Sequence, residues 1–335
     1  MTDSSQVYGD YIDRLIIIHT ATIYLFRQIL TGIPLLLLLL QLPAVYSFNN
    51  LGMVLDFFKP YYYRIEQKVA SKGIPEVASK TDRITLDTCS KQGASLDHSL
   101  WTAVLKRHVV PDCTFGVVTG VNAVDYAALQ DDTDYAAYMD ILAKADPTSL
   151  SGAEQLAFWM NAYNAACINL IVEHEKKSGD KLTSINKLTD SSGQVWDQPA
   201  AIITGKPVSL SHIEHEQLRG VWAEPAVHAC IVCASSSCPN LRPEAFEGVT
   251  VAEQMKDQMK QWMTNDTKGL RVTGNRLELS RIFLWFSADF GSSNADIRKF
   301  LQPYVAEHQN KIVKGSPVVR YFEYDWQMNR APSKE

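Results

Sequence analysis

The apolar pattern at residues 152–176 predicts a long, buried helix. It begins with Ser151-Gly-Ala-Glu154, where a hydroxyl and, three positions later, a carboxylate form the capping box that starts many helices. Between Leu156 and Val172 apolar residues occupy nearly every side of the helix, which is typical of a helix in the middle of a protein. We therefore expect this helix to form the centre of the fold.

Two asparagines interrupt the apolar pattern of this helix. Asn161 and Asn164 are three positions apart and therefore share one face. Buried carboxamides need hydrogen-bond partners, because a buried polar group without one costs free energy. Either these side chains hold the backbone of neighbouring loops, or one of them orients a catalytic group or binds a substrate carbonyl.

A short apolar run at residues 227–234 predicts a strand. It is bounded by Pro225 and by the polar segment Ser235–Pro239. A continuous apolar run of this length between turn signals is typical of a central strand buried on both faces. Because side chains alternate along a strand, Cys230 and Cys233 would face opposite ways and could neither share a zinc ion nor form a redox pair.

Cys238 differs from these two cysteines because it follows the predicted strand, in a polar turn. A thiol at the end of a central strand is exposed enough to react, and nearby backbone N–H groups can lower its pKa. The alternative is a structural disulfide between Cys238 and Cys233 across the serine turn.

The remaining patterns complete the fold class. Residues 269–280 alternate apolar and polar side chains around Gly274-Asn275, which is typical of a β-hairpin. Residues 281–290 and 295–308 have helical patterns. The sequence therefore predicts an α+β fold, a mostly helical single domain around a small β-sheet.

The first 47 residues carry a targeting pattern. The leucine-rich run Ile29–Leu40 is shorter than the roughly 20 residues of a membrane span and is typical of a signal peptide cleaved before Phe48. Without cleavage, residues 15–46 would be a transmembrane anchor; a misassigned start or a buried helix is the third interpretation. We expect a secretory protein, extracellular or membrane-anchored. The alternative is a plastid protein with a two-part leader, because a phenylalanine after the cleavage point resembles such leaders in algae with secondary plastids.

The leader and the folded body divide the chain. We predict four parts: a signal peptide or anchor at 1–47, a linker or pro-segment-like region at 48–96, the domain at 97–329, and a tail at 330–335.

Composition narrows the function class. Apolar residues make up 46% of the chain and charged residues 21%, as in ordinary globular proteins. The formal charge of −5 and the lack of a basic run exclude nucleic acid as a partner attracted by bulk charge. Six cysteines are too few for a disulfide scaffold. In an oxidising compartment Cys89 could pair with Cys113, and Asn265-Asp-Thr267 is a glycosylation sequon.

Several separate segments resemble one known family in the family's order. They are His98–Trp101, Val124–Tyr126, Glu154–Ala166, Val195–Asp197, Leu210–His215, His228–Leu241, Leu279–Gly291 and Tyr324–Asn329. Through them the chain resembles the family catalogued as domain of unknown function 547 (DUF547). The resemblance supplies no activity. The family-typical positions that match here are Asn161, Tyr163, Asn164, Glu214, His215, His228, Ser237, Cys238 and Pro239. His212 departs from the acidic residue that is usual at its position.

The leading hypothesis is a thiol-centred catalytic site. Cys238 would be the nucleophile, His215 or His228 the base and Glu214 the orienting group. Asn161 or Asn164 would polarise the substrate carbonyl. Such a site would make the protein a cysteine-dependent hydrolase or acyl transferase. Its substrate would be a small molecule or peptide with an amide, ester or thioester bond.

Two alternatives belong to other classes. His215, His228 and Cys238 could bind zinc, since three such ligands leave the fourth position open for water. Otherwise no cofactor is expected. The domain could also be a non-enzymatic binding or scaffolding module whose polar motifs only constrain the fold.

Overall fold

A computed structural model of the chain describes residues 59–69, 74, 82–189, 194–291 and 293–332. The chain divides into two units, Met1–Pro75 and Glu76–Glu335. In the first unit residues 59–69 are helical. The predicted leader at 1–47 lies outside the described residues. None of the described helices is long and apolar enough to span a membrane.

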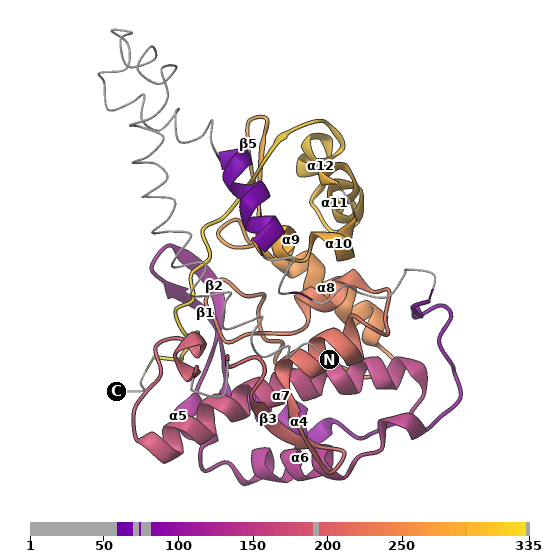
Figure 1. Cartoon of the computed structure of the whole chain (residues 1–335), viewed down its shortest axis with the longest axis vertical. Coiled ribbons are helices and arrows are strands. Elements are labelled where there is room, and N and C mark those ends of the chain that lie inside the picture. The colour runs from indigo at the N-terminus through magenta and orange to yellow at the C-terminus, as the bar shows by residue number, and fades with distance from the viewer. Residues whose placement is uncertain (1–58, 70–73, 75–81, 190–193, 292, 333–335) are drawn as a thin grey trace, which may run out of the picture. The chain divides into compact units, whose positions relative to one another are not determined.

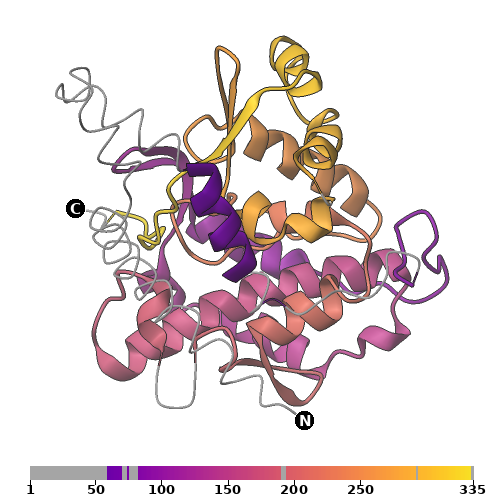
Figure 2. The same cartoon turned by 45° about the horizontal axis from the view of Figure 1, so that its top comes forward.

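The second unit is organised around helix α7, Gly152–Ser178, which confirms the predicted central helix. Ser151 caps its first turn, and Gly179 ends it in the left-handed conformation with φ of 74°. Its side chains are buried almost continuously from Leu156 to Ile168. Figures 1 and 2 show α7 crossing the unit, with other helices on both sides.

Short elements pack directly against α7. These are α5 (Tyr126–Leu129), α8 (Val251–Thr264), β3 (Pro199–Ile203), the 3₁₀ turn η2 (Pro147–Ser149) and the π-helical turn η4 (His212–Leu218). Helix α6 (Thr133–Lys144) packs on β3 and on α4 (Ser99–His108), where the Trp101 and Tyr138 rings stack 5.2 Å apart. The other helical elements are η3 (Ile185–Leu188), η5 (Pro225–Ala229), α9 (Ile282–Trp285), α10 (Ser287–Phe290), α11 (Asn294–Leu301) and α12 (Glu307–Lys314).

The described strands form three small sheets. Strands β1 (Val109–Phe115) and β2 (Val118–Val124) make one hairpin, and β3 makes another with β4 (Lys206–Ser209). The third sheet has the order β5-β6-β7, formed by Leu270–Thr273, Arg276–Leu279 and Val318–Tyr321. Its β5–β6 hairpin turns at Gly274 with φ of 57°, which confirms the hairpin predicted there. The α+β class is therefore confirmed.

The predicted central strand at residues 227–234 is wrong. Residues 225–229 form η5, which starts at Pro225, and residues 230–234 continue without regular structure. Proline fixes φ near its helical value, which favours a helical start. Asn164 of α7 hydrogen-bonds this backbone on both sides, with its Nδ2 donating to the Cys230 carbonyl at 2.9 Å and its Oδ1 accepting from the Val232 N–H at 2.9 Å. The carboxamide thus replaces the partner strand, and the run is buried without a sheet.

Asn161 makes the same kind of double contact one turn earlier. Its Nδ2 donates to the Phe246 carbonyl at 2.8 Å, and its Oδ1 accepts from the Phe246 N–H at 2.9 Å. Asn161 and Phe246 are each 1% exposed, so water cannot take over these bonds. Both asparagines therefore hold loop backbone, the first of the two roles weighed for them.

We expect Asn161→Leu to lower the free energy of unfolding by about 2–4 kcal/mol, because it leaves a buried N–H and a buried carbonyl of Phe246 unpaired. Urea denaturation monitored by circular dichroism measures the change. Asn169→Leu is the matched control on the same helix. This side chain is half-buried and donates once, to the Ala200 carbonyl, so its loss should cost less than about 1.5 kcal/mol. Equal losses of unfolding free energy in the two variants would contradict the role of Asn161 in holding the Phe246 backbone.

Candidate active site around Cys238

The turn that carries Cys238 is fixed to the C-terminal segment of the chain. Ser235 forms an antiparallel bridge with Met328, and the Ser236 N–H donates to the Gln327 carbonyl at 2.8 Å. The Ser237 hydroxyl accepts from the Asp325 N–H at 2.8 Å. Just before the turn, Ala234 adopts φ of 60°, a conformation that side chains disfavour. This reversal brings Cys238 back to Cys233.

The sulfur atoms of Cys233 and Cys238 lie 2.7 Å apart, and all six cysteines are free thiols. The Cys238 Sγ accepts from the Cys233 N–H at 3.1 Å. The Tyr324 hydroxyl lies 3.3 Å from the Cys233 Sγ and 3.0 Å from the Ser235 Oγ. Cys238 is 3% exposed, whereas Cys233 and Tyr324 are half-buried. The polar turn therefore holds a thiol pair with its own hydrogen-bond donors.

The two thiols of this pair have opposite pKa shifts. Burial, together with the hydrogen bond to Cys238 and that group's charge, raises the pKa of Cys233 well above its ordinary value. Burial also opposes ionisation of Cys238, but hydrogen bonds from Cys233 and Tyr324 and the charge of Lys268 outweigh it, so the pKa of Cys238 lies below its ordinary value. Cys238 is therefore the more acidic thiol of the pair, and Cys233 the less acidic one.

Lys268 is a buried cation beside this turn. The residue is 3% exposed, and its Nζ donates to the Asn240 Oδ1 at 2.7 Å and to the Ser236 carbonyl at 3.4 Å. Both acceptors are neutral, and Nζ forms no ion pair with a carboxylate among the residues that the structure describes. Burial lowers the pKa of Lys268 to about 8, while the charges of Cys238 and Cys233 act in the opposite direction.

The predicted histidines lie in a second cluster. Asp289 accepts from Arg219 at 2.6 Å and pairs with the His228 Nε2 at 2.8 Å, and all three are buried. Arg219 Nη1 donates to the His215 Nδ1 at 2.8 Å, so the neutral ring of His215 carries its proton on Nε2. Burial lowers the pKa of His215 to about 4; the charge of Arg219 also lowers it, and that of Glu214 opposes both.

Burial opposes ionisation of Asp289, but His228 and Arg219 hold the pKa of its carboxyl far below the usual range. Its carboxylate is therefore the fixed negative charge of this cluster.

Three aromatic residues, Trp285, Phe286 and Tyr163, lie near the two clusters. The Phe286 ring packs 4.4 Å from the His228 ring and lies under the Arg219 guanidinium, whereas the adjacent Trp285 ring packs 4.8 Å from Tyr324. Tyr163 of α7 donates its hydroxyl to Glu214 at 3.4 Å. Burial raises the pKa of Tyr163, and the charges of Glu214, Cys167, Cys233 and Cys238 raise it further. The pKa of this hydroxyl therefore depends on Glu214 and on the thiol pair.

The structure thus divides the predicted site residues. Cys238 interacts with Cys233 and Tyr324, and the charge of Lys268 acts on it. His215 contacts Arg219, and His228 contacts Asp289. Asn161 and Asn164 hold backbone. Among the described residues, no group of three or more His, Cys, Asp or Glu side chains is arranged to hold a metal ion.

Four members of these clusters are missing from the sequence predictions: Arg219, Lys268, Asp289 and Tyr324. Tyr324 begins one of the segments that carry the family resemblance, which is a signal that could have identified it. Asp289 lies in another of these segments, Leu279–Gly291, and has the same signal. Arg219 and Lys268 lie outside the segments, and Arg219 is 70 positions from its partner Asp289.

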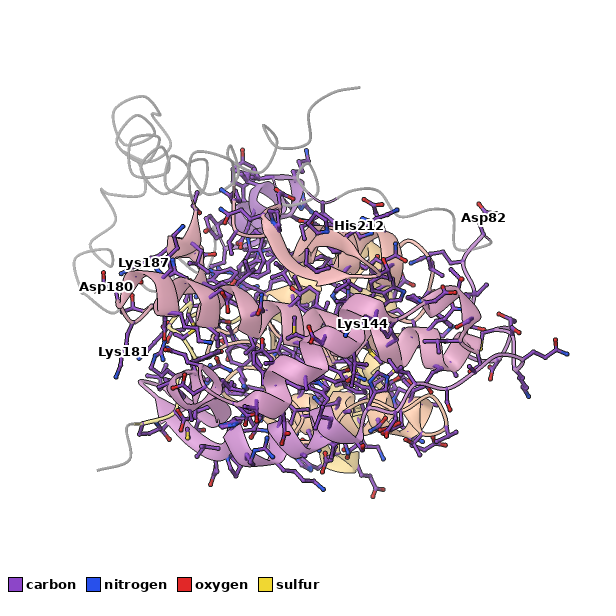
Figure 3. The ribbon with its side chains drawn as sticks, turned by 90° about the horizontal axis from the view of Figure 1, so that it is seen from below. Asp82, Lys144, Asp180, Lys181, Lys187 and His212 are labelled. Atoms are coloured by element: carbon purple, nitrogen blue, oxygen red, sulfur yellow. The ribbon has the colours of Figure 1, made fainter. Side chains whose placement is uncertain are left out.

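His212 faces a different region. It lines an open cavity of about 630 Å³ together with Trp159, Asp197, Lys206 and Gln217. Its Nδ1 lies 3.1 Å from Glu216 and its Nε2 3.1 Å from Gln217. Figure 3 shows His212 well away from Asp180, Lys181 and Lys187, which gather near the end of α7. His212 is therefore not part of the thiol or histidine clusters.

The sequon asparagine has structural partners. Asn265 is half-buried; its Nδ2 donates to the Thr119 carbonyl at 2.8 Å, and its Oδ1 accepts from Thr267. Its glycosylation stays a prediction.

Comparison with known proteins agrees with the resemblance found in the sequence. Residues 147–263 match the family model described as "Protein of unknown function, DUF547". No curated protein and no solved structure matches the chain. The matched region includes α7, both asparagines, His215, His228 and the thiol pair, whereas Lys268, Asp289 and Tyr324 follow it. The chain therefore contains a DUF547 domain, matched over residues 147–263.

Proposed function

We propose that the protein is a thiol-dependent acyl hydrolase or acyl transferase whose nucleophile is Cys238. The observation that carries this proposal is the paired arrangement of Cys233 and Cys238, in which Cys238 accepts hydrogen bonds beside a buried lysine. Ionised sulfur is the reactive form of cysteine, and hydrogen bonds with a nearby cation are what generate it near neutral pH.

In the first step the Cys238 thiolate attacks the carbonyl carbon of an ester, thioester or amide. A carbon–sulfur bond forms, and the bond from the carbonyl carbon to the leaving oxygen, sulfur or nitrogen breaks. The leaving group takes a proton from the Cys233 thiol. This thiol still carries its proton when the leaving group departs, because its pKa is raised. The product is a thioester on Cys238 and the free alcohol, thiol or amine.

In the second step water or another acceptor attacks the thioester carbonyl carbon. The carbon–sulfur bond breaks, the acceptor's proton returns to Cys233, and Cys238 leaves as the thiolate beside Lys268. Water gives hydrolysis, and an alcohol, thiol or amine gives acyl transfer.

The histidines have a different place in this proposal from the one predicted from sequence. In this proposal the Cys233 N–H, Tyr324 and Lys268 favour ionisation of Cys238, so the first step uses no histidine base. His228 and His215 pack with Arg219 and Asp289 against Phe286, which supports a positioning role on the neighbouring turn. Their role as base, with Glu214 as orienting group, stays a prediction. Localisation and membrane attachment likewise stay predictions.

We expect incubation with p-nitrophenyl acetate to acetylate Cys238. The Cys238→Ala variant should lose p-nitrophenol release by about 10⁴-fold or more, as when other enzymatic nucleophiles are removed. Peptide mass spectrometry locates the acetyl group. Cys113→Ala, which removes a half-buried thiol of strand β1, is the matched control and should react like the wild type. Full activity in Cys238→Ala, or isolation of Cys233 and Cys238 as a disulfide that resists reductant, would contradict the proposal.

We expect a bell-shaped pH profile of kcat/KM for the same ester. Activity should rise as the Cys238 thiol ionises, and this limb should lie below the ordinary thiol pKa of about 8.5. It should fall above about pH 8, where Lys268 loses its proton and the thiolate loses its counter-charge. Lys268→Met should move the rising limb to higher pH, and Lys268→Arg should not. A rising limb unchanged in Lys268→Met would show that this charge does not stabilise the thiolate.

A further inference from the structure

Four aromatic side chains form a partly exposed cluster beside the thiol pair. The Trp285 and Trp326 rings are nearly parallel with centroids 6.0 Å apart, and Tyr324 lies 4.8 Å from Trp285 and 4.7 Å from Trp326. Trp196 packs 6.0 Å from Trp326. All four residues are half-buried, so the rest of the chain does not cover them completely. We refer to Trp196, Trp285, Tyr324 and Trp326 as the aromatic wall.

The aromatic wall is assembled from three separate parts of the chain. Trp196 precedes β3, Trp285 ends α9, and Tyr324 and Trp326 follow β7. Large aromatic side chains of this kind contribute most to burial when they are fully covered, so a contiguous group that remains partly exposed marks a surface for binding an apolar group. The ordinary scatter of single exposed apolar residues does not account for it.

Tyr324 connects the aromatic wall to the reactive sulfur. Its half-exposed ring packs against Trp285 and Trp326, while its hydroxyl contacts the Cys233 Sγ and the Ser235 Oγ. A group lying on the wall would therefore be continuous with a carbonyl placed at the thiol pair. This is the relation that an acyl chain has to its own carbonyl carbon.

Some polar side chains near the wall in sequence are already paired. Arg281 donates to Glu323 at 2.8 Å, and the Asp325 Oδ1 accepts from the Gln327 N–H at 2.9 Å. The Tyr324 hydroxyl is occupied by Ser235 and the thiol. A polyhydroxylated ligand such as a saccharide needs polar partners around an aromatic surface, and these pairings reduce the number of such partners beside Tyr324.

We infer that the aromatic wall binds the acyl group of the substrate, and that the enzyme prefers acyl donors with an aryl or extended aliphatic chain over acetyl donors. This inference rests on the proposed function, because it places the substrate carbonyl at Cys238. Longer acyl chains cover more of the ring surface and thereby gain binding free energy from apolar burial.

The first test measures binding without chemistry. The full chain carrying Cys238→Ala is titrated with N-methyloctanamide, N-methylacetamide and maltose, followed by intrinsic tryptophan fluorescence and calorimetry. We expect the octanamide to bind at least about tenfold more tightly than the acetamide, and adding Trp326→Ala should remove that difference. Trp326→Phe should restore most of it. Phe322→Ala, a half-buried aromatic outside the wall, should leave it unchanged. Equal binding of the two amides, or binding of maltose alone, would overturn the inference.

The second test compares turnover of p-nitrophenyl octanoate and p-nitrophenyl acetate by the wild type. We expect kcat/KM to be at least about tenfold higher for the octanoate, and Trp326→Ala to lower kcat/KM for the octanoate more than for the acetate. Equal turnover of both esters would overturn the inference and leave the proposed function standing. Selective octanamide binding with no turnover of either ester would support the wall as a binding site and contradict the proposed acyl chemistry.

Discussion

The carboxamide of Asn164 takes the place that a neighbouring strand would have in a sheet. It donates to the Cys230 carbonyl and accepts from the Val232 N–H, so a segment without regular structure is buried against α7 with its backbone paired. Asn161 does the same for Phe246. Both contacts come from a helix that is buried on nearly all sides, where each unpaired backbone group would cost about 1–3 kcal/mol. The position of the loops around α7 therefore depends on two amide groups rather than on a sheet.

This arrangement explains how a dithiol can form here. In a strand, Cys233 would continue in an extended direction and Cys238 would lie beyond it. Because the segment is held by a side chain, it is free to reverse at Ala234, and the bridge between Ser235 and Met328 fixes the reversal. The C-terminal segment then contributes Tyr324 to the thiol pair, and Trp285 packs against the Tyr324 ring. The site is thus built from parts of the chain that only the tertiary fold brings together.

The sequence predicts the parts of this structure that depend on local patterns. Helix α7, its start at Ser151 and the hairpin at Gly274 follow from capping residues, periodicity and turn chemistry. Only half of the predicted capping box forms, because the Glu154 carboxylate accepts from the Gly248 N–H and lies 3.2 Å from His98. The prediction of a strand at 227–234 is wrong because it also depends on a tertiary contact. An apolar run shows that a segment is buried, but not whether a strand or an asparagine supplies its hydrogen bonds. The pairing of Arg219 with Asp289 and that of Lys268 with Asn240 could not be predicted, since these partners are distant in sequence.

Two buried cations in this domain have different counter-charges. Arg219 is neutralised by the Asp289 carboxylate at 2.6 Å, and that pair also holds His215 and His228. Lys268 is equally buried, but within the described part of the chain its ammonium donates only to the neutral Asn240 and Ser236 oxygens. A buried charge needs a partner of opposite sign, because desolvation in a protein interior costs several kcal/mol for each ion. The group beside Lys268 that can supply a negative charge is the Cys238 thiol, whose ionised form also accepts the Cys233 N–H. Ionisation of Cys238 and protonation of Lys268 therefore favour each other, and losing either charge makes the other more costly to keep.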